Sequence, residues 1–125
     1  MKVYEFPFSV AYADTDAEGI VYHGRYIEIA ERARMQLLLG VQIPETDIGF
    51  VIRELNIKYN LPLRLADSFI VRSRIVNLGA ASMQIEQQFI HGDDVCAVLN
   101  IVVAYVGANM RPARIPDAIV KRLSE

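Results

Sequence analysis

The sequence predicts an α+β fold of one long helix, five strands and a short C-terminal helix. One segment carries apolar residues at helical spacing, four others alternate apolar and polar residues, and a fifth is apolar throughout. Short turns separate the last strands, which favours antiparallel hairpins. The 125 residues, 53% of them hydrophobic and 22% charged, fit one folded domain spanning residues 1–125.

The first elements are a strand, an acidic loop and the long helix. Phe8, Val10 and Tyr12 alternate ahead of the loop, as in a strand with one buried face. The helix is expected over residues 24–39, and Gly40 suits its end. Its apolar stripe, spaced to face a core, is Tyr26, Ala30, Ala33 and Leu37.

Four strands are expected after Gly49. In three of them one alternation is apolar: Val51, Leu55, Ile57 and Tyr59, then Phe69, Val71 and Ile75, then Met83, Ile85 and Phe89. Residues 95–106 are apolar on both alternations, which predicts a central strand covered on both sides. One long helix cannot cover both faces and both edges of such a sheet, so we expect an obligate homo-oligomer.

Composition excludes several classes of protein. The formal net charge is -2, and the cations are scattered among acids, so nucleic acid is not an expected partner. Cys96 is the only cysteine, which rules out an internal disulfide and fits a reducing cytoplasm. The sequence contains neither a secretory signal nor an apolar run long enough to span a bilayer. A cytoplasmic protein without a transmembrane segment is expected.

The most informative segment is residues 12–26, which brings a carboxylate, a histidine and a helix start into one short loop. The helix N-terminus can polarise a carbonyl, while a carboxylate attacks that carbonyl or activates water. This is the chemistry of ester or thioester hydrolysis. The candidate catalytic residues are Asp16, His23 and Tyr12.

Each candidate also has a structural interpretation. As a nucleophile Asp16 would form an acyl-enzyme anhydride, and as a general base it would activate water; it could also simply cap a turn. Asp14, which the extended backbone points away from Asp16, is interpreted as structural. His23 could orient the carboxylate, donate to the carbonyl or steady the leaving thiolate, or bond only the loop backbone. Tyr12 could hydrogen-bond in the site or merely pack.

The ordered motif resembles that of the hotdog-fold acyl-CoA thioesterases of the 4-hydroxybenzoyl-CoA thioesterase superfamily. It is most similar to the branch encoded beside the Tol-Pal cell-envelope system. The matching elements are Tyr12, Asp14-Thr15-Asp16, Gly19-Ile20-Val21, Tyr22-His23 and Glu31-Arg32-Ala33-Arg34, with a further match at residues 111–116. Departures are Glu18, where a small residue is common, and Gly24-Arg25, where a small residue and asparagine are more usual.

The resemblance implies a five-stranded antiparallel sheet wrapped around one long central helix. It implies dimers joined edge to edge, frequent tetramers, and active sites at the dimer interface. Asp16 would be the catalytic carboxylate, Tyr12 and His23 its neighbours, and the backbone N–H of His23 the donor to the thioester carbonyl. The substrate would be an acyl-CoA, or an acyl group on acyl carrier protein. Neither a metal nor a cofactor is expected, since coenzyme A is part of the substrate.

Two rival functions remain open from sequence. A hotdog hydratase or dehydratase would act on the acyl thioester without cleaving it, and a non-catalytic module would bind acyl-CoA or acyl carrier protein without turnover. Serine or cysteine nucleophiles have no support, because Cys96 lies in a core strand and no Gly-x-Ser-x-Gly elbow occurs.

Overall fold

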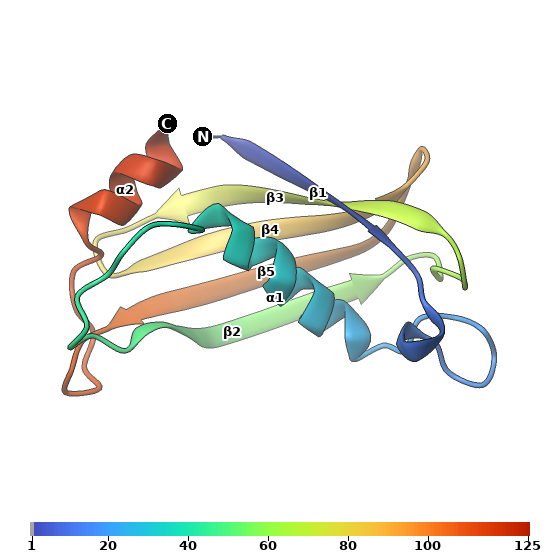
Figure 1. Cartoon of the computed structure of the whole chain (residues 1–125), viewed down its shortest axis with the longest axis horizontal. Coiled ribbons are helices and arrows are strands. Elements are labelled where there is room, and N and C mark those ends of the chain that lie inside the picture. The colour runs from blue at the N-terminus through green and yellow to red at the C-terminus, as the bar shows by residue number, and fades with distance from the viewer. Residues whose placement is uncertain (1) are drawn as a thin grey trace.

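The computed structural model describes residues 2–125, and its elements follow the expected order (Figure 1). The strands are β1 (Val3–Ser9), β2 (Gly49–Tyr59), β3 (Ser68–Leu78), β4 (Ser82–His91) and β5 (Asp94–Val106). The helices are α1 (Arg25–Leu37) and α2 (Asp117–Ser124), and a 3₁₀ turn, η1, covers Tyr12–Asp14.

The five strands form one antiparallel sheet in the order β1-β3-β4-β5-β2. β1 and β2 are therefore its edges, and β5 is an interior strand. Helix α1 crosses one face of the sheet and packs against β1 and β3 (Figure 1). No helix within residues 2–125 is long and apolar enough to cross a membrane.

The predicted inward face of α1 is confirmed. Tyr26, Ala30, Ala33 and Leu37 are all buried, the two alanines completely. Small residues at the centre of this stripe let the helix approach the sheet closely, while the larger residues at its ends fill the space beside the strands. Gly40 has a φ of +82°, a conformation that favours glycine, and it follows the last turn of the helix as expected.

The prediction that the first strand reaches Tyr12 is wrong, because β1 ends at Ser9. Val10 is still buried, but the Ala11 N–H then donates to the Asp14 carboxylate at 2.8 Å. This side-chain bond closes the η1 turn in place of a strand pairing. Tyr12 consequently lies on the surface with 83% of its area exposed.

The expected cover on both sides of the last strand included a second subunit, and within the single chain one side of β5 is buried. β5 is interior, and one alternation, including Leu99 and Ile101, is fully buried. On the other side of β5, Val98 and Asn100 are half-buried. Their neighbours on β4 include Gln88 and the charged Glu86, so this face of the sheet tolerates water.

A buried polar network joins α1 to the sheet. The Gln87 amide nitrogen donates to the Ala30 carbonyl and to the Ser73 hydroxyl, both at 3.0 Å. A carbonyl can only accept, which fixes the amide orientation and leaves the Gln87 oxygen to accept from Arg34 at 3.0 Å. Burial lowers the pKa of the Arg34 guanidinium. The strand pattern did not predict this network, since Ser73 and Gln87 occupy core positions.

Replacing Gln87 with leucine is expected to lower the free energy of unfolding by about 1–3 kcal/mol, because Ala30 and Arg34 would keep buried polar groups without a partner. Gln88→Leu, on the opposite and half-exposed face of β4, is the matched control and should change stability by less than about 0.5 kcal/mol. Urea unfolding at equal protein concentrations measures both. Equal losses in the two variants would contradict the importance of the network.

Candidate active site

The loop before α1 is shaped by its own hydrogen bonds. The Asp16 N–H donates to the Ile20 carbonyl at 3.0 Å, and the Gly19 N–H donates to the Asp16 carbonyl at 3.1 Å. Gly19 has a φ of +78°, which a side chain would strain. The Asp16 Oδ1 accepts the Glu18 N–H at 2.8 Å. Asp16 therefore does make the turn contact that its structural interpretation requires.

That contact uses one of the two carboxylate oxygens. Within the part of the chain that the structure describes, Asp16 Oδ2 makes no hydrogen bond. Asp16 also lines a cavity of about 400 Å³, together with His23. A carboxylate held by one oxygen keeps the second for a ligand or a water, so the turn contact and a catalytic role are compatible.

Asp14 has the structural contacts expected of it. Besides accepting from Ala11, its carboxylate lies 3.4 Å from the Arg25 guanidinium, and its carbonyl accepts the Tyr22 N–H at 2.9 Å. Arg25 also donates to the Ala13 carbonyl at 2.6 Å. The guanidinium therefore links the loop to the first turn of α1, a link that the sequence departure at Arg25 makes possible.

His23 lies two residues before the first residue of α1, with its ring packed on Tyr22 at a centroid distance of 4.3 Å. The N–H groups of Tyr22 and Arg25 donate to backbone carbonyls. In contrast, the N–H groups of His23 and Gly24 donate no hydrogen bond to any residue in the range 2–125. Two adjacent donors at a helix N-terminus can bind the oxygen of a polarised carbonyl.

Tyr12 is the one candidate that this chain does not bring to the cavity wall. Its carbonyl accepts from the N–H and the hydroxyl of Thr15, at 3.2 and 3.0 Å, but its side chain is exposed. Its catalytic role stays a prediction.

The sequence does not single out another part of the cavity lining. This part comes from the end of β2 and the turn after it: Tyr59, Asn60, Leu61 and Pro62. Apolar alternation assigns Tyr59 to the apolar face of a strand, yet its hydroxyl donates to the His23 carbonyl at 2.7 Å. The polar tip of a tyrosine at a strand end was the available signal.

Tyr26 anchors this end of α1. It is 3% exposed, and its ring lies edge-on to those of Tyr59 and Phe89, with centroids 5.2 and 5.1 Å away. Its hydroxyl accepts the Leu63 N–H at 3.3 Å. Burial raises the pKa of Tyr26, so the hydroxyl is neutral at physiological pH. The prediction that Tyr26 faces the core is confirmed, and Tyr26 also lines the cavity that contains Asp16.

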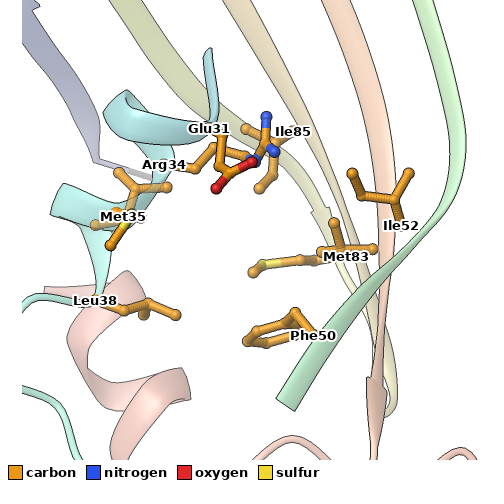
Figure 2. Close-up of a pocket in the computed structure, with 10 residues that line it drawn as sticks. Glu31, Arg34, Met35, Leu38, Phe50, Ile52, Met83 and Ile85 are labelled. Atoms are coloured by element: carbon orange, nitrogen blue, oxygen red, sulfur yellow. The ribbon is translucent and has the colours of Figure 1, made fainter. Parts of the chain in front are cut away.

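A second cavity of about 330 Å³ lies between the second half of α1 and the start of β2 (Figure 2). Met35 and Leu38 face it from the helix side, and Phe50 and Ile52 from β2. The Arg34 guanidinium and Glu31 carboxylate lie at one end of this apolar space (Figure 2). It occupies the opposite end of α1 from Asp16 and His23.

The thiol of Cys96 is poorly suited to act as a nucleophile. Cys96 is buried, and burial raises the pKa of its thiol, which disfavours the nucleophilic thiolate. Among residues 2–125 no group of three or more His, Cys, Asp or Glu side chains is placed to hold a metal ion.

Several known proteins have sequences similar to that of this chain. The family model described as Thioesterase-like superfamily matches residues 10–123. Acyl-CoA thioester hydrolase YbgC of Escherichia coli O6:H1 is 28% identical over 132 residues, covering 98% of this chain and 97% of that protein. Acyl-CoA thioesterase YbgC of Haemophilus influenzae is 30% identical over 123 residues, covering 93% and 90%.

A solved structure is also similar to this chain. Gentisyl-coenzyme A thioesterase BH1999 has a TM-score of 0.81 and 29% identity, covering 95% of this chain and 99% of that one. The chain belongs to the Thioesterase-like superfamily and has its hotdog-like fold of a five-stranded antiparallel sheet with two helices.

Arg25→Gln is expected to loosen the acidic loop with little effect on global stability, because exposed ion pairs contribute only about 0–1 kcal/mol. Hydrogen exchange should accelerate at the amides of Ala11 and Tyr22, both of which donate to Asp14. Arg32→Gln, on the exposed face of the same helix, is the control. Unchanged exchange at both amides in Arg25→Gln would contradict a linking role for Arg25.

Proposed function

We propose that this protein hydrolyses an acyl-CoA thioester to the free acid and coenzyme A at the cavity lined by Asp16 and His23. The observation that carries the proposal is that Asp16 and His23 line one cavity in a member of the thioesterase superfamily. The backbone N–H groups of His23 and of the adjacent Gly24 are unpaired among residues 2–125 and lie at the start of α1. The N–H groups of His23 and Gly24 would receive the carbonyl oxygen and stabilise the negative charge that develops on it.

Asp16 would supply the second part of the reaction. As a general base it takes a proton from water, the hydroxide adds to the carbonyl carbon, the C–S bond breaks, and the coenzyme A thiolate leaves. As a nucleophile it adds directly to the carbonyl carbon, the C–S bond breaks and the coenzyme A thiolate leaves, and water then hydrolyses the resulting anhydride to the free acid and the Asp16 carboxylate. His23 would steady the leaving thiolate or orient the carboxylate, and Tyr12 would join the site only from the surface of the loop. The reaction needs no metal or separate cofactor.

We further propose that a second subunit completes the site. Asp16 and His23 are both exposed in the single chain, whereas stabilisation of an oxyanion is strongest where water is excluded. β2 is an open edge that pairs only with β5 among the described strands, and it exposes Ile52 by 51%. The other edge strand, β1, contains Pro7, which cannot donate to a further strand.

A two-fold dimer through β2 would bring the two cavities together. Such symmetry pairs β2 antiparallel to its copy, so the end that carries Phe50 and Ile52 lies beside the partner subunit's Tyr59. We call the cavity lined by Asp16 and His23 the reactive cavity. The apolar cavity at the start of β2 would then adjoin the partner subunit's reactive cavity and receive the acyl group. Two such dimers would form the homotetramer implied by the family resemblance, acting in the cytoplasm on coenzyme A or acyl-carrier-protein thioesters.

Asp16→Asn is expected to reduce thiol release by about 10²–10⁴-fold, the usual contribution of an acid–base group, while the fold is retained. Asp93→Asn, at the exposed β4–β5 turn, keeps the same change of charge away from the site and should leave turnover unchanged. The assay follows free thiol from short-chain, long-chain and aromatic acyl-CoAs. An Asp16→Asn enzyme with undiminished activity would eliminate this mechanism.

Product identity separates hydrolysis from the rival activities. Gain or loss of water with the thioester intact would indicate a hydratase or dehydratase. Saturable binding of acyl-CoA without any product would indicate a binding module.

Ile52→Lys is expected to weaken the dimer, because it places a charge at the open edge of β2. Sedimentation velocity should show a shift toward monomer compared with the parent protein. Val76→Lys is the control, since Val76 is a similarly exposed strand residue, at 45%, on β3. A parent protein that sediments as a monomer at micromolar concentration would exclude the composite site.

A further inference from the structure

Among residues 2–125, Tyr59 makes the one side-chain hydrogen bond from β2 to the backbone beside the reactive cavity. Its hydroxyl donates to the His23 carbonyl at 2.7 Å, across 36 positions in sequence. Both residues line the cavity that contains Asp16. The bond therefore connects the end of β2 to the segment that carries the two unpaired N–H groups.

The bonded carbonyl belongs to the peptide between His23 and Gly24. Because a trans peptide unit is planar, holding its oxygen also holds the Gly24 N–H, which lies in the same plane and points in the opposite direction. A hydrogen bond to the oxygen additionally polarises the peptide and strengthens its N–H as a donor. The Tyr59 hydroxyl thus acts on one of the two groups available for the carbonyl of a thioester.

The tyrosine itself is held in place. Its ring packs edge-on against Tyr26, a buried residue in the first turn of α1. Burial raises the pKa of the Tyr59 hydroxyl, so the proton needed for donation is present at neutral pH and above. Because 47% of Tyr59 is exposed, its position depends on the ring contact with Tyr26 and on the hydrogen bond to His23.

We propose that Tyr59 is a positioning residue for thioester hydrolysis, which holds and polarises the His23–Gly24 peptide so that the Gly24 N–H faces the carbonyl oxygen of the substrate. The inference rests on the proposed function and adds a residue and a role to it. Tyr59 does not transfer a proton in this account, because its hydroxyl hydrogen is engaged by the His23 carbonyl.

Tyr59→Phe removes only the hydroxyl and keeps the ring packed on Tyr26. The expected result is a fall in kcat of about tenfold, the effect of one hydrogen bond, with KM changed by less than about twofold. The shape of the pH–rate profile should be unchanged. The amide signal of Gly24 in an NMR spectrum should shift, since its peptide loses the bond at the oxygen.

The matched control is Tyr4→Phe. The Tyr4 hydroxyl also donates to a backbone carbonyl, that of Arg122, at 3.5 Å, but it does not line the reactive cavity. Its kcat and its Gly24 signal should equal those of the parent. Equal losses of kcat in the two variants would assign the effect to general stability and overturn the inference.

Two further results would overturn it while the proposed function stands. One is an active parent with a Tyr59→Phe kcat within about twofold of it. The other is loss of the alkaline limb of the pH–rate profile in Tyr59→Phe, which would make the tyrosine a proton donor. A parent protein that releases no thiol from any acyl-CoA overturns the proposed function and this inference together.

Discussion

The packing of Tyr26 beneath the end of β2 is the interaction on which the rest of the site depends. Its ring contacts Tyr59 on β2 and Phe89 on β4, and its hydroxyl accepts a hydrogen bond from Leu63 after β2. Because Tyr26 is the second residue of α1, this burial sets where the helix starts relative to the sheet. The helix start in turn sets where the unpaired N–H groups of His23 and Gly24 lie.

The reactive loop itself is held by a different kind of interaction. The loop contains few buried side chains. Its shape comes from local hydrogen bonds that the Asp14 and Asp16 carboxylates accept and that the Arg25 guanidinium donates. Such a loop keeps its polar groups near solvent, where a charged substrate can reach them. Its stability is correspondingly low compared with the core, so its position depends on the anchored helix at one end and the buried Val10 at the other.

The sequence predicted the elements that periodicity determines. The inward face of α1 and the alternating faces of β3 and β4 follow from apolar spacing, and the placement of Asp16 and His23 at one cavity follows from their closeness in the chain. The end of β1 was missed because the Asp14 side chain competes with strand pairing. Such competition has no apolar signature.

Long-range polar contacts were the other feature that sequence reasoning missed. Gln87 sits in a strand position that apolar alternation would fill with a hydrophobic residue, and its partners Ala30 and Arg34 are distant in sequence. Tyr59 contacts His23 across the same kind of separation. Periodicity reports which face of an element is buried, but not which polar groups will meet once the helix lies on the sheet.

We propose that the thioester carbonyl binds between Asp16 and the start of α1, and a crystal structure of the Asp16→Asn variant with a bound acyl-CoA would show whether it does. The carbonyl oxygen should lie about 2.7–3.1 Å from the N–H groups of His23 or Gly24, with the carbonyl carbon beside residue 16. An acyl-CoA bound with its thioester away from this helix start would rule out this site for the reaction.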